Sequence, residues 1–131
     1  MVSVKDLEVK LSNKFPLKNA AGEELPDVFV ELLSPASKEF RAAQSVMLNS
    51  LFTVTAEGVK TVDKTADQKE ADKLLVLNAA TVAFHGLEMD SLEGKDLVRA
   101  IYDNPRLGFI HEQVDKLLGV WGNFTNEPNK N

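Results

Sequence analysis

The sequence feature that most constrains the fold is the stretch LLVLNAATVAF, which runs from Leu74 to Phe84. Nine of its 11 residues are apolar, so a folded chain has to keep this stretch away from water on nearly all sides. Upstream, Thr65 is followed three residues later by Gln68, the pattern of a capping box at a helix start. Gly86 is a typical helix stop. Because a helix that is apolar all round is surrounded by other elements, the sequence predicts a central buried helix over residues 66–85.

Two dipeptides predict further helix starts. Ser34-Pro35 and Asn104-Pro105 each place a side chain that accepts hydrogen bonds from free first-turn amides before a proline, which needs no hydrogen bond there. Apolar residues at helical spacing follow each dipeptide, and a shorter amphipathic pattern lies before the second one. We therefore expect three further helices, over residues 35–52, 95–103 and 105–121.

Two apolar runs around a polar turn precede these helices. The turn contains Gly22, and the alternation of side chains from Val28 to Leu32 indicates a strand. Pro16 and Pro26 favour an edge strand or the flanks of the turn, because proline cannot donate to a sheet. The pattern predicts a β-hairpin over residues 13–33.

Together these elements predict a mainly α fold, with about four helices and an N-terminal β-hairpin. The length of 131 residues suits a single compact domain, which we expect over residues 1–125. Residues 126–131 have nothing to bury and are expected to be a flexible tail. The charged residues after Glu57 predict a mobile surface loop before the central helix.

Composition argues against several classes of function. The net charge is −5 and no run of Lys and Arg offsets it, so we expect no nucleic-acid partner. The chain has no cysteine, which excludes disulfides, thiolate metal ligands and a Cys nucleophile. Charges at Lys5 and Asp6 interrupt the apolar core that a secretion signal needs, and no apolar run reaches the ~20 residues of a membrane span. We expect a soluble cytoplasmic protein without a membrane partner.

The segment HEQVD, which begins at His111, has an acid, Asp115, where a zinc protease has its second histidine. Helical geometry places His111 at the rim of the apolar stripe, whereas Glu112 and Lys116 suit a pair on the surface. We therefore interpret HEQVD as the polar side of a helix.

His85, the other histidine, precedes Gly86 at the predicted end of the central helix, where an imidazolium interacts well with the helix dipole. In an alternative interpretation, His85, His111 and Asp115 hold a metal ion in a small metal-dependent hydrolase, which requires the ends of two helices to meet. The preferred interpretation predicts no catalytic residue, no metal and no cofactor.

Aromatic residues are concentrated near the C-terminus. Trp121 and Phe124 follow the last predicted helix, and they either close the core or anchor a partner or a neighbouring copy. With Leu107 and Ile110, on the apolar face of that helix, they are the candidate partner-binding residues.

Three pieces of the chain, in order, carry a resemblance to a known family. They are VELLSPASKEFRAAQ (Val30 to Gln44), the apolar stretch that ends in AFHGLE, and YDNPRLGFIHEQVDKLLGVWGNF (Tyr102 to Phe124). The chain resembles the small tail assembly chaperones of long-tailed bacteriophages, in which a strand leads into a Ser-Pro helix start and the chain closes with a Pro-led helix and an aromatic end.

The resemblance implies a non-enzymatic protein of virion assembly in the host cytoplasm, absent from the mature virion. Such chaperones bind the long tape measure protein, keep it soluble, help to recruit the tail tube protein and tend to self-associate. An alternative is a structural head-tail or tail-terminator protein that stays in the virion. An acidic helical domain without a catalytic cluster suits the chaperone, because an amphipathic partner helix needs an apolar groove and little else.

Overall fold

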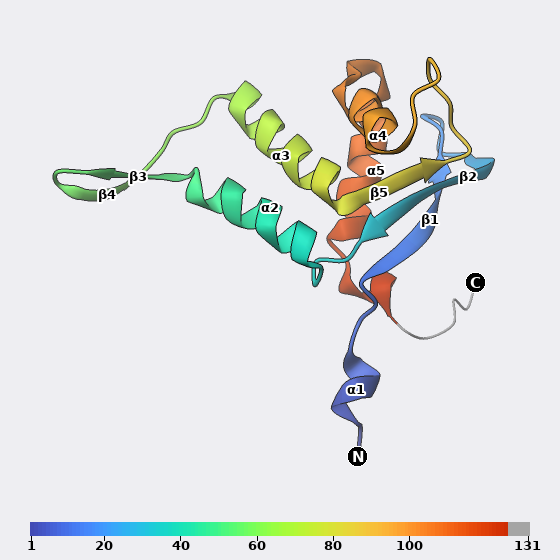
Figure 1. Ribbon diagram of the computed structural model, residues 1–131, viewed down its shortest axis with the longest axis horizontal. Coiled ribbons are helices and arrows are strands. Elements are labelled where there is room, and N and C mark those ends of the chain that lie inside the picture. The colour runs from blue at the N-terminus through green and yellow to red at the C-terminus, as the bar shows by residue number, and fades with distance from the viewer. Residues whose placement is uncertain (126–131) are drawn as a thin grey trace.

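The fold is described from a computed structural model, which describes residues 1–125 of the chain. The predicted mainly α fold is wrong: the fold is α+β, with 47% helical and 24% strand residues. Helices pack against one face of a three-stranded sheet, and a two-stranded sheet projects far from it (Figure 1). The expected tail, residues 126–131, lies outside the described residues.

The elements follow one another in a simple order. They are α1 (Val4–Leu7), β1 (Ser12–Lys18), β2 (Glu24–Leu33), α2 (Lys38–Asn49), β3 (Phe52–Thr55), β4 (Gly58–Thr61), α3 (Ala66–Ala80), β5 (Thr81–His85), α4 (Gly94–Asp103), the 3₁₀ turn η1 (Pro105–Leu107), α5 (Gly108–Leu118) and the 3₁₀ turn η2 (Trp121–Phe124).

The predicted N-terminal hairpin is confirmed, because β1 and β2 pair antiparallel. β2 is the middle strand of the order β1-β2-β5. Pro16 lies on β1, an edge strand, where a missing donor costs little. Pro26 lies in the middle strand, but at a shift of register before the part of β2 that pairs with β5, which begins at Phe29. Both prolines therefore avoid the doubly paired part of the sheet.

The predicted central buried helix over residues 66–85 is wrong in its last five residues and in its burial, because α3 buries only Leu77 and Ala80. The capping box of Thr65 and Gln68 is confirmed, but α3 ends at Ala80 and the chain continues directly as β5. β5 pairs antiparallel with β2 and supplies partners for backbone groups of that strand, which would otherwise lie unpaired. Gly86 follows a strand rather than a helix. Apolar periodicity alone does not separate a buried helix from a buried strand. In this chain the pairing with β2 makes residues 81–85 a strand.

The predicted helix over residues 35–52 is also shorter than expected. The chain makes a turn at Ser34, and α2 begins at Lys38 with Ser37 as its cap, because the Ser37 hydroxyl accepts from the Phe40 amide at 3.2 Å. Phe52 belongs to β3, which pairs with β4 where a mobile loop was expected. The predicted loop is therefore a β-hairpin.

The C-terminal helices follow the sequence more closely. The prediction over residues 95–103 is confirmed by α4. The Asn104 cap is confirmed too, since its side chain accepts from the Arg106 amide at 3.0 Å. The helix predicted over residues 105–121 is split into η1 and α5, and it ends at Leu118, before Gly119. Trp121 and Phe124 lie in the separate turn η2.

The core lies between one face of the three-stranded sheet and the helices α3, α4 and α5. Phe124 closes it at one end, where its ring meets the edge of Phe15 with centroids 5.5 Å apart. The Lys10 amide donates to the Phe124 carbonyl at 2.6 Å, which ties the N-terminal segment to η2. The largest fully buried side chains are those of Tyr102, Phe124, Leu17, Leu32, Leu77, Val30, Val98 and Val114.

Gly86 provides a test of this packing. Its φ is +84°, and a Cβ atom there would lie 2.1 Å from the Asp27 carbonyl oxygen. We predict that Gly86→Ala lowers the free energy of unfolding by about 3 kcal/mol, because it adds a backbone clash to the cost of a left-handed conformation. The matched control is Gly94→Ala, where φ is +57° but no atom lies within 4 Å; there we expect a loss of about 1 kcal/mol. The measurement is the free energy of unfolding in urea. Equal losses in the two variants would contradict the close approach of Gly86 to Asp27.

Candidate partner-binding surface

The most distinctive feature of the molecule is a projection, which we call the arm and which consists of α2, β3, β4 and α3. α2 and α3 pack against each other, and the β3–β4 hairpin lies at their far end (Figure 1). Only the ends of the two helices near the sheet enter the core, through Phe40, Ala43, Leu77 and Ala80. The other residues of these four elements are half-buried or exposed, and of them Leu74 and Val76 pack against the core.

The β3–β4 hairpin buries none of its own residues. All eight strand residues are exposed. In the register of the two strands, Val54 lies opposite Val59, and Phe52 shares their face. Val54 is 81% exposed. A solitary two-stranded hairpin is marginally stable in water. Packing of this apolar face against another surface would therefore stabilise the hairpin.

A polar contact holds the hairpin at its root. The Lys64 ammonium donates to the Asp72 carboxylate and to the Ser50 hydroxyl, and its side chain is only 8% exposed. Next to it, the Val62 amide donates to the Leu51 carbonyl at 2.6 Å. Breaking a largely buried ion pair is costly, so these contacts fix the direction in which the hairpin points.

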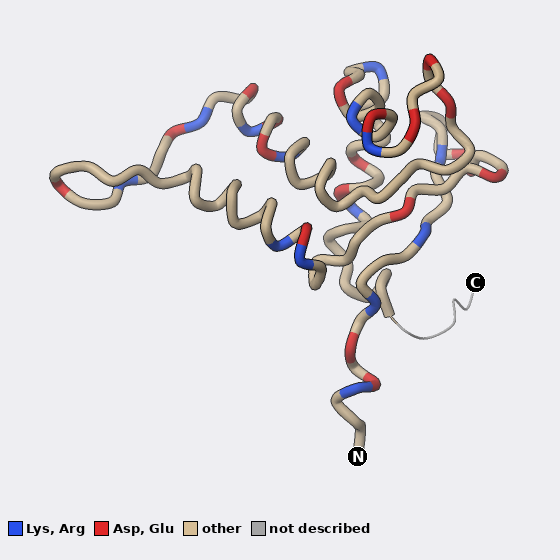
Figure 2. The backbone as a smooth tube through the Cα atoms, in the orientation of Figure 1, with Lys and Arg blue, Asp and Glu red and all other residues tan. Residues whose placement is uncertain are grey.

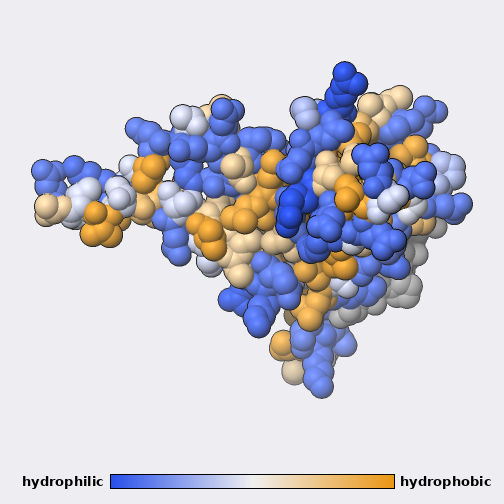
Figure 3. Space-filling view, turned by 45° about the horizontal axis from the view of Figure 1, so that its top comes forward, coloured by the Kyte–Doolittle hydropathy of each residue, from blue (hydrophilic) through white to orange (hydrophobic). Residues whose placement is uncertain are grey.

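The two sides of the arm differ in charge. No charged residue occurs in the 15 residues from Ala42 to Ala56, which form the outer part of α2 and all of β3. α3 and the segment before it carry charges of both signs (Figure 2). Within the uncharged run, Val46, Leu48 and Phe52 are exposed, and hydrophobic surface is visible on the hairpin and along the arm (Figure 3).

A second apolar feature is a pocket in the body of the protein, which we call the Leu107 pocket. Its volume is about 270 Å³. It opens between the β1–β2 turn, the loop after β5, and the start of α5. It is lined by Leu17, Lys18, Asn19, Leu25, Leu87, Glu88, Met89, Ile101, Leu107, Phe109 and Ile110. The tight approach of Gly86 to Asp27 brings the loop after β5 against β2, the strand that carries Leu25.

The four candidate partner-binding residues occupy three different places. Leu107 and Ile110 line the Leu107 pocket, Leu107 being partly buried and Ile110 buried. Phe124 is fully buried in the core. Trp121 is 55% exposed, and it lines a separate groove of about 350 Å³ that runs past Phe40 and Leu118.

Several residues of these surfaces were not expected from the sequence. Leu87 and Met89 in the Leu107 pocket lie in a polar link that carries no periodic signal. The hairpin had a signal, because FTVT and GVKT contain β-branched residues on both sides of the turn residues Ala56 and Glu57. The mixed charges after Glu57 instead led us to predict a surface loop there.

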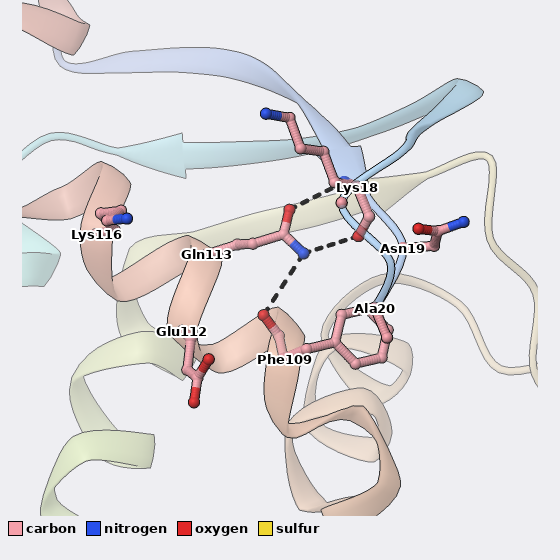
Figure 4. Close-up of a pocket in the computed structure, with 8 residues that line it drawn as sticks. Lys18, Asn19, Ala20, Phe109, Glu112, Gln113 and Lys116 are labelled. Carbon is pink, nitrogen blue, oxygen red and sulfur yellow. Dashed lines mark hydrogen bonds between the residues drawn. The ribbon is translucent and has the colours of Figure 1, made fainter.

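The polar residues of HEQVD have different roles in α5. Gln113 bridges to the end of β1: its side-chain oxygen accepts from the Lys18 amide at 2.9 Å, and its nitrogen donates to the Lys18 carbonyl at 2.7 Å (Figure 4). Glu112 and Lys116 are exposed and line the surrounding surface pocket of about 400 Å³. Gln113 thus fastens α5 to the sheet, while Glu112 and Lys116 remain at the surface.

The structure does not bring His85, His111 and Asp115, the three residues of the metal-site alternative, into one site. His85 lies on β5 and contacts Glu31 at 3.0 Å. Its neighbour Phe84 points toward Tyr102 in the core, so His85 faces the other side of the sheet. His111 is a buried residue of α5, where its ring meets Tyr102 of α4 and its Nδ1 lies 3.6 Å from Glu70 of α3. Within residues 1–125, no group of three or more His, Asp or Glu side chains is placed to hold a metal ion.

Thr81, at the start of β5, organises a buried polar cluster. Its hydroxyl donates to the Leu77 carbonyl at 2.6 Å, so the Tyr102 hydroxyl must donate to Thr81, at 2.7 Å. Burial raises the pKa of Tyr102, and the hydrogen bond to Thr81 only partly opposes this. The Lys95 ammonium donates to the Thr81 carbonyl at 2.5 Å; burial, followed by the Arg99 charge, lowers the pKa of Lys95.

Comparisons with known proteins returned no relative: no protein-family model matches the chain, and no similar curated protein or solved structure was found. No helix among residues 1–125 is both long and apolar enough to cross a membrane.

Tyr102 is the chain's one tyrosine, which makes its titration measurable. Because its pKa is raised in the folded state, the folded chain keeps the proton longer than the unfolded chain. Stability is therefore complete below the unfolded pKa of about 10 and falls above it, by about 1.4 kcal/mol per pH unit. We predict that Tyr102→Phe costs about 1 kcal/mol at neutral pH but removes this alkaline loss.

The measurement is urea unfolding of both chains at about pH 8 and about pH 11. Lys95 has the opposite dependence, because its lowered pKa makes stability rise with pH toward its unfolded value. Lys95 is present in both chains. The difference between their unfolding free energies at the two pH values therefore reports Tyr102 alone. Phenolate absorbance that appears near pH 10 in the folded chain would contradict the buried environment.

Proposed function

We propose that this chain is a tail assembly chaperone of a long-tailed bacteriophage, which binds the tape measure protein and keeps it soluble while tail tube subunits assemble around it. The family comes from the resemblance of three sequence segments. The observation that carries the binding role is the Leu107 pocket, which is apolar and lined by two of the candidate residues, Leu107 and Ile110.

The pocket suits an anchor side chain better than a free small ligand. Its volume of about 270 Å³ lies just below the ~300 Å³ at which ligand sites typically begin. Amphipathic helices bind by placing apolar side chains from one face into such depressions. A tape measure protein is largely helical in the family that this chain resembles, and its apolar face would supply these anchors. The role is binding, not catalysis.

Co-expression tests this proposal directly. We expect the tape measure protein of the same phage to be soluble with this chain and to aggregate without it. Met89→Lys places a charge in the wall of the pocket, within a loop, and should lower the soluble fraction at least about fivefold, the effect of losing one significant interface contact.

The matched control is Asp90→Asn, which makes the same charge change one residue away, at an exposed position that does not line the pocket. It should preserve the solubility of the partner. A tape measure protein that stays soluble alone, or that responds equally to the two variants, would contradict the proposal. We place the protein in the host cytoplasm and outside the mature virion, so purified particles should lack it in mass spectrometry.

A further inference from the structure

The edges of the two sheets differ in how well they are protected. β1, an edge of the larger sheet, contains Pro16 between Lys14 and Lys18, and both proline and lysine discourage another strand from pairing there. β3, with the sequence FTVT, has neither proline nor charge. In β4, Lys60 interrupts the opposite edge of the hairpin and pairs with Glu57 at 2.8 Å. β3 is therefore an exposed strand that lacks the proline and the charge found on these two edges, and only its length of four residues limits pairing there.

Charge favours the same strand as a contact between copies. Each copy carries a net charge of −5, so two copies repel each other over most of their surfaces. The repulsion is weakest where the surface is uncharged, and the run from Ala42 to Ala56 ends in β3. A second copy is thus the occupant for which an uncharged edge matters most.

The exposed area leaves room for such a contact. The chain exposes 9247 Å², whereas a compact monomer of 14.4 kDa exposes about 6,800 Å². Residues 126–131, which lie outside the described part of the chain, account for at most about 1,000 Å² of the difference. An excess of about 1,400 Å² remains, more than the ~800 Å² that each partner contributes to a standard interface.

We propose that β3 pairs antiparallel with β3 of a second copy, so that the two hairpins form one four-stranded sheet across a two-fold axis. Two identical strands in antiparallel order satisfy this symmetry by construction. Phe52, Val54 and Val59 of both copies then share one face. The inference rests on the strand edges and not on the chaperone proposal, and either one can fail without the other.

A contact between two short strands is small, so the dimer should be weak and dependent on concentration. We expect sedimentation velocity to show the wild-type chain passing from monomer to dimer between about 10 and about 500 μM, which brackets a dissociation constant of about 100 μM. Val54→Lys places two like charges at the axis and should raise the dissociation constant at least about tenfold. Ser45→Lys, which adds the same charge to an exposed position of α2, should leave it within about twofold.

Far-UV circular dichroism and the fluorescence of the single Trp121 check that the variants are folded. A wild-type chain that is monomeric over the whole range, or equal dissociation constants for the two lysine variants, would overturn the proposal.

Cross-linking identifies the edge. The chain lacks cysteine, so single cysteines can be placed at Thr53 in β3 or at Lys60 in β4. These two residues lie directly opposite each other in the hairpin and share its face, so they differ only in the strand that carries them. Pairing through β3 predicts faster dimer cross-linking by a short bis-maleimide for Thr53→Cys than for Lys60→Cys. Faster cross-linking of Lys60→Cys, or equal slow rates for both, would overturn it.

Discussion

The fold depends on the junction at which α3 ends and β5 begins without a loop between them. The last carbonyls of a helix have no partner inside the helix, and burying them unpaired is costly. Here the Leu77 carbonyl accepts from both the amide and the hydroxyl of Thr81. The Lys95 ammonium donates to the carbonyls of Asn78, in the last turn of α3, and of Thr81, the first residue of β5. Lys95 comes from α4, so the same contact fastens that helix to the junction. From this junction β5 runs directly into its pairing with β2.

This junction also marks what the sequence could and could not predict. Three local signals are confirmed, namely the capping box at Thr65, the Asn104 cap and the first hairpin. Two others, the helix start at Ser34-Pro35 and the helix stop at Gly86, are wrong. The division of the apolar run into a helix and a strand was missed, because its donor, Lys95, lies 14 residues beyond Thr81 and its pairing strand lies far upstream. Such long-range contacts leave no local pattern in the sequence. Because β5 was missed for this reason, the predicted fold class was mainly α, whereas the structure is α+β.

The candidate site was predictable to a similar degree. The predicted helical stripe contains Leu107 and Ile110, and the structure places both in the wall of one pocket. The same reasoning could not separate Trp121, on the surface, from Phe124, in the core, since both follow glycines and differ only in tertiary contacts. The pocket and the arm are distinct surfaces on separate parts of the fold, which would let the protein hold one partner in the body while the hairpin meets another.

The connection between β2 and β5 has a consequence for how such a protein can vary. These strands are neighbours in the sheet, so the whole arm is an excursion that leaves the sheet and returns to it. One further turn in each of α2 and α3 would carry the hairpin about 5.4 Å outward without changing a single strand pair. Spacing between the body and the tip is therefore an adjustable length, set by a part of the chain that the core does not constrain.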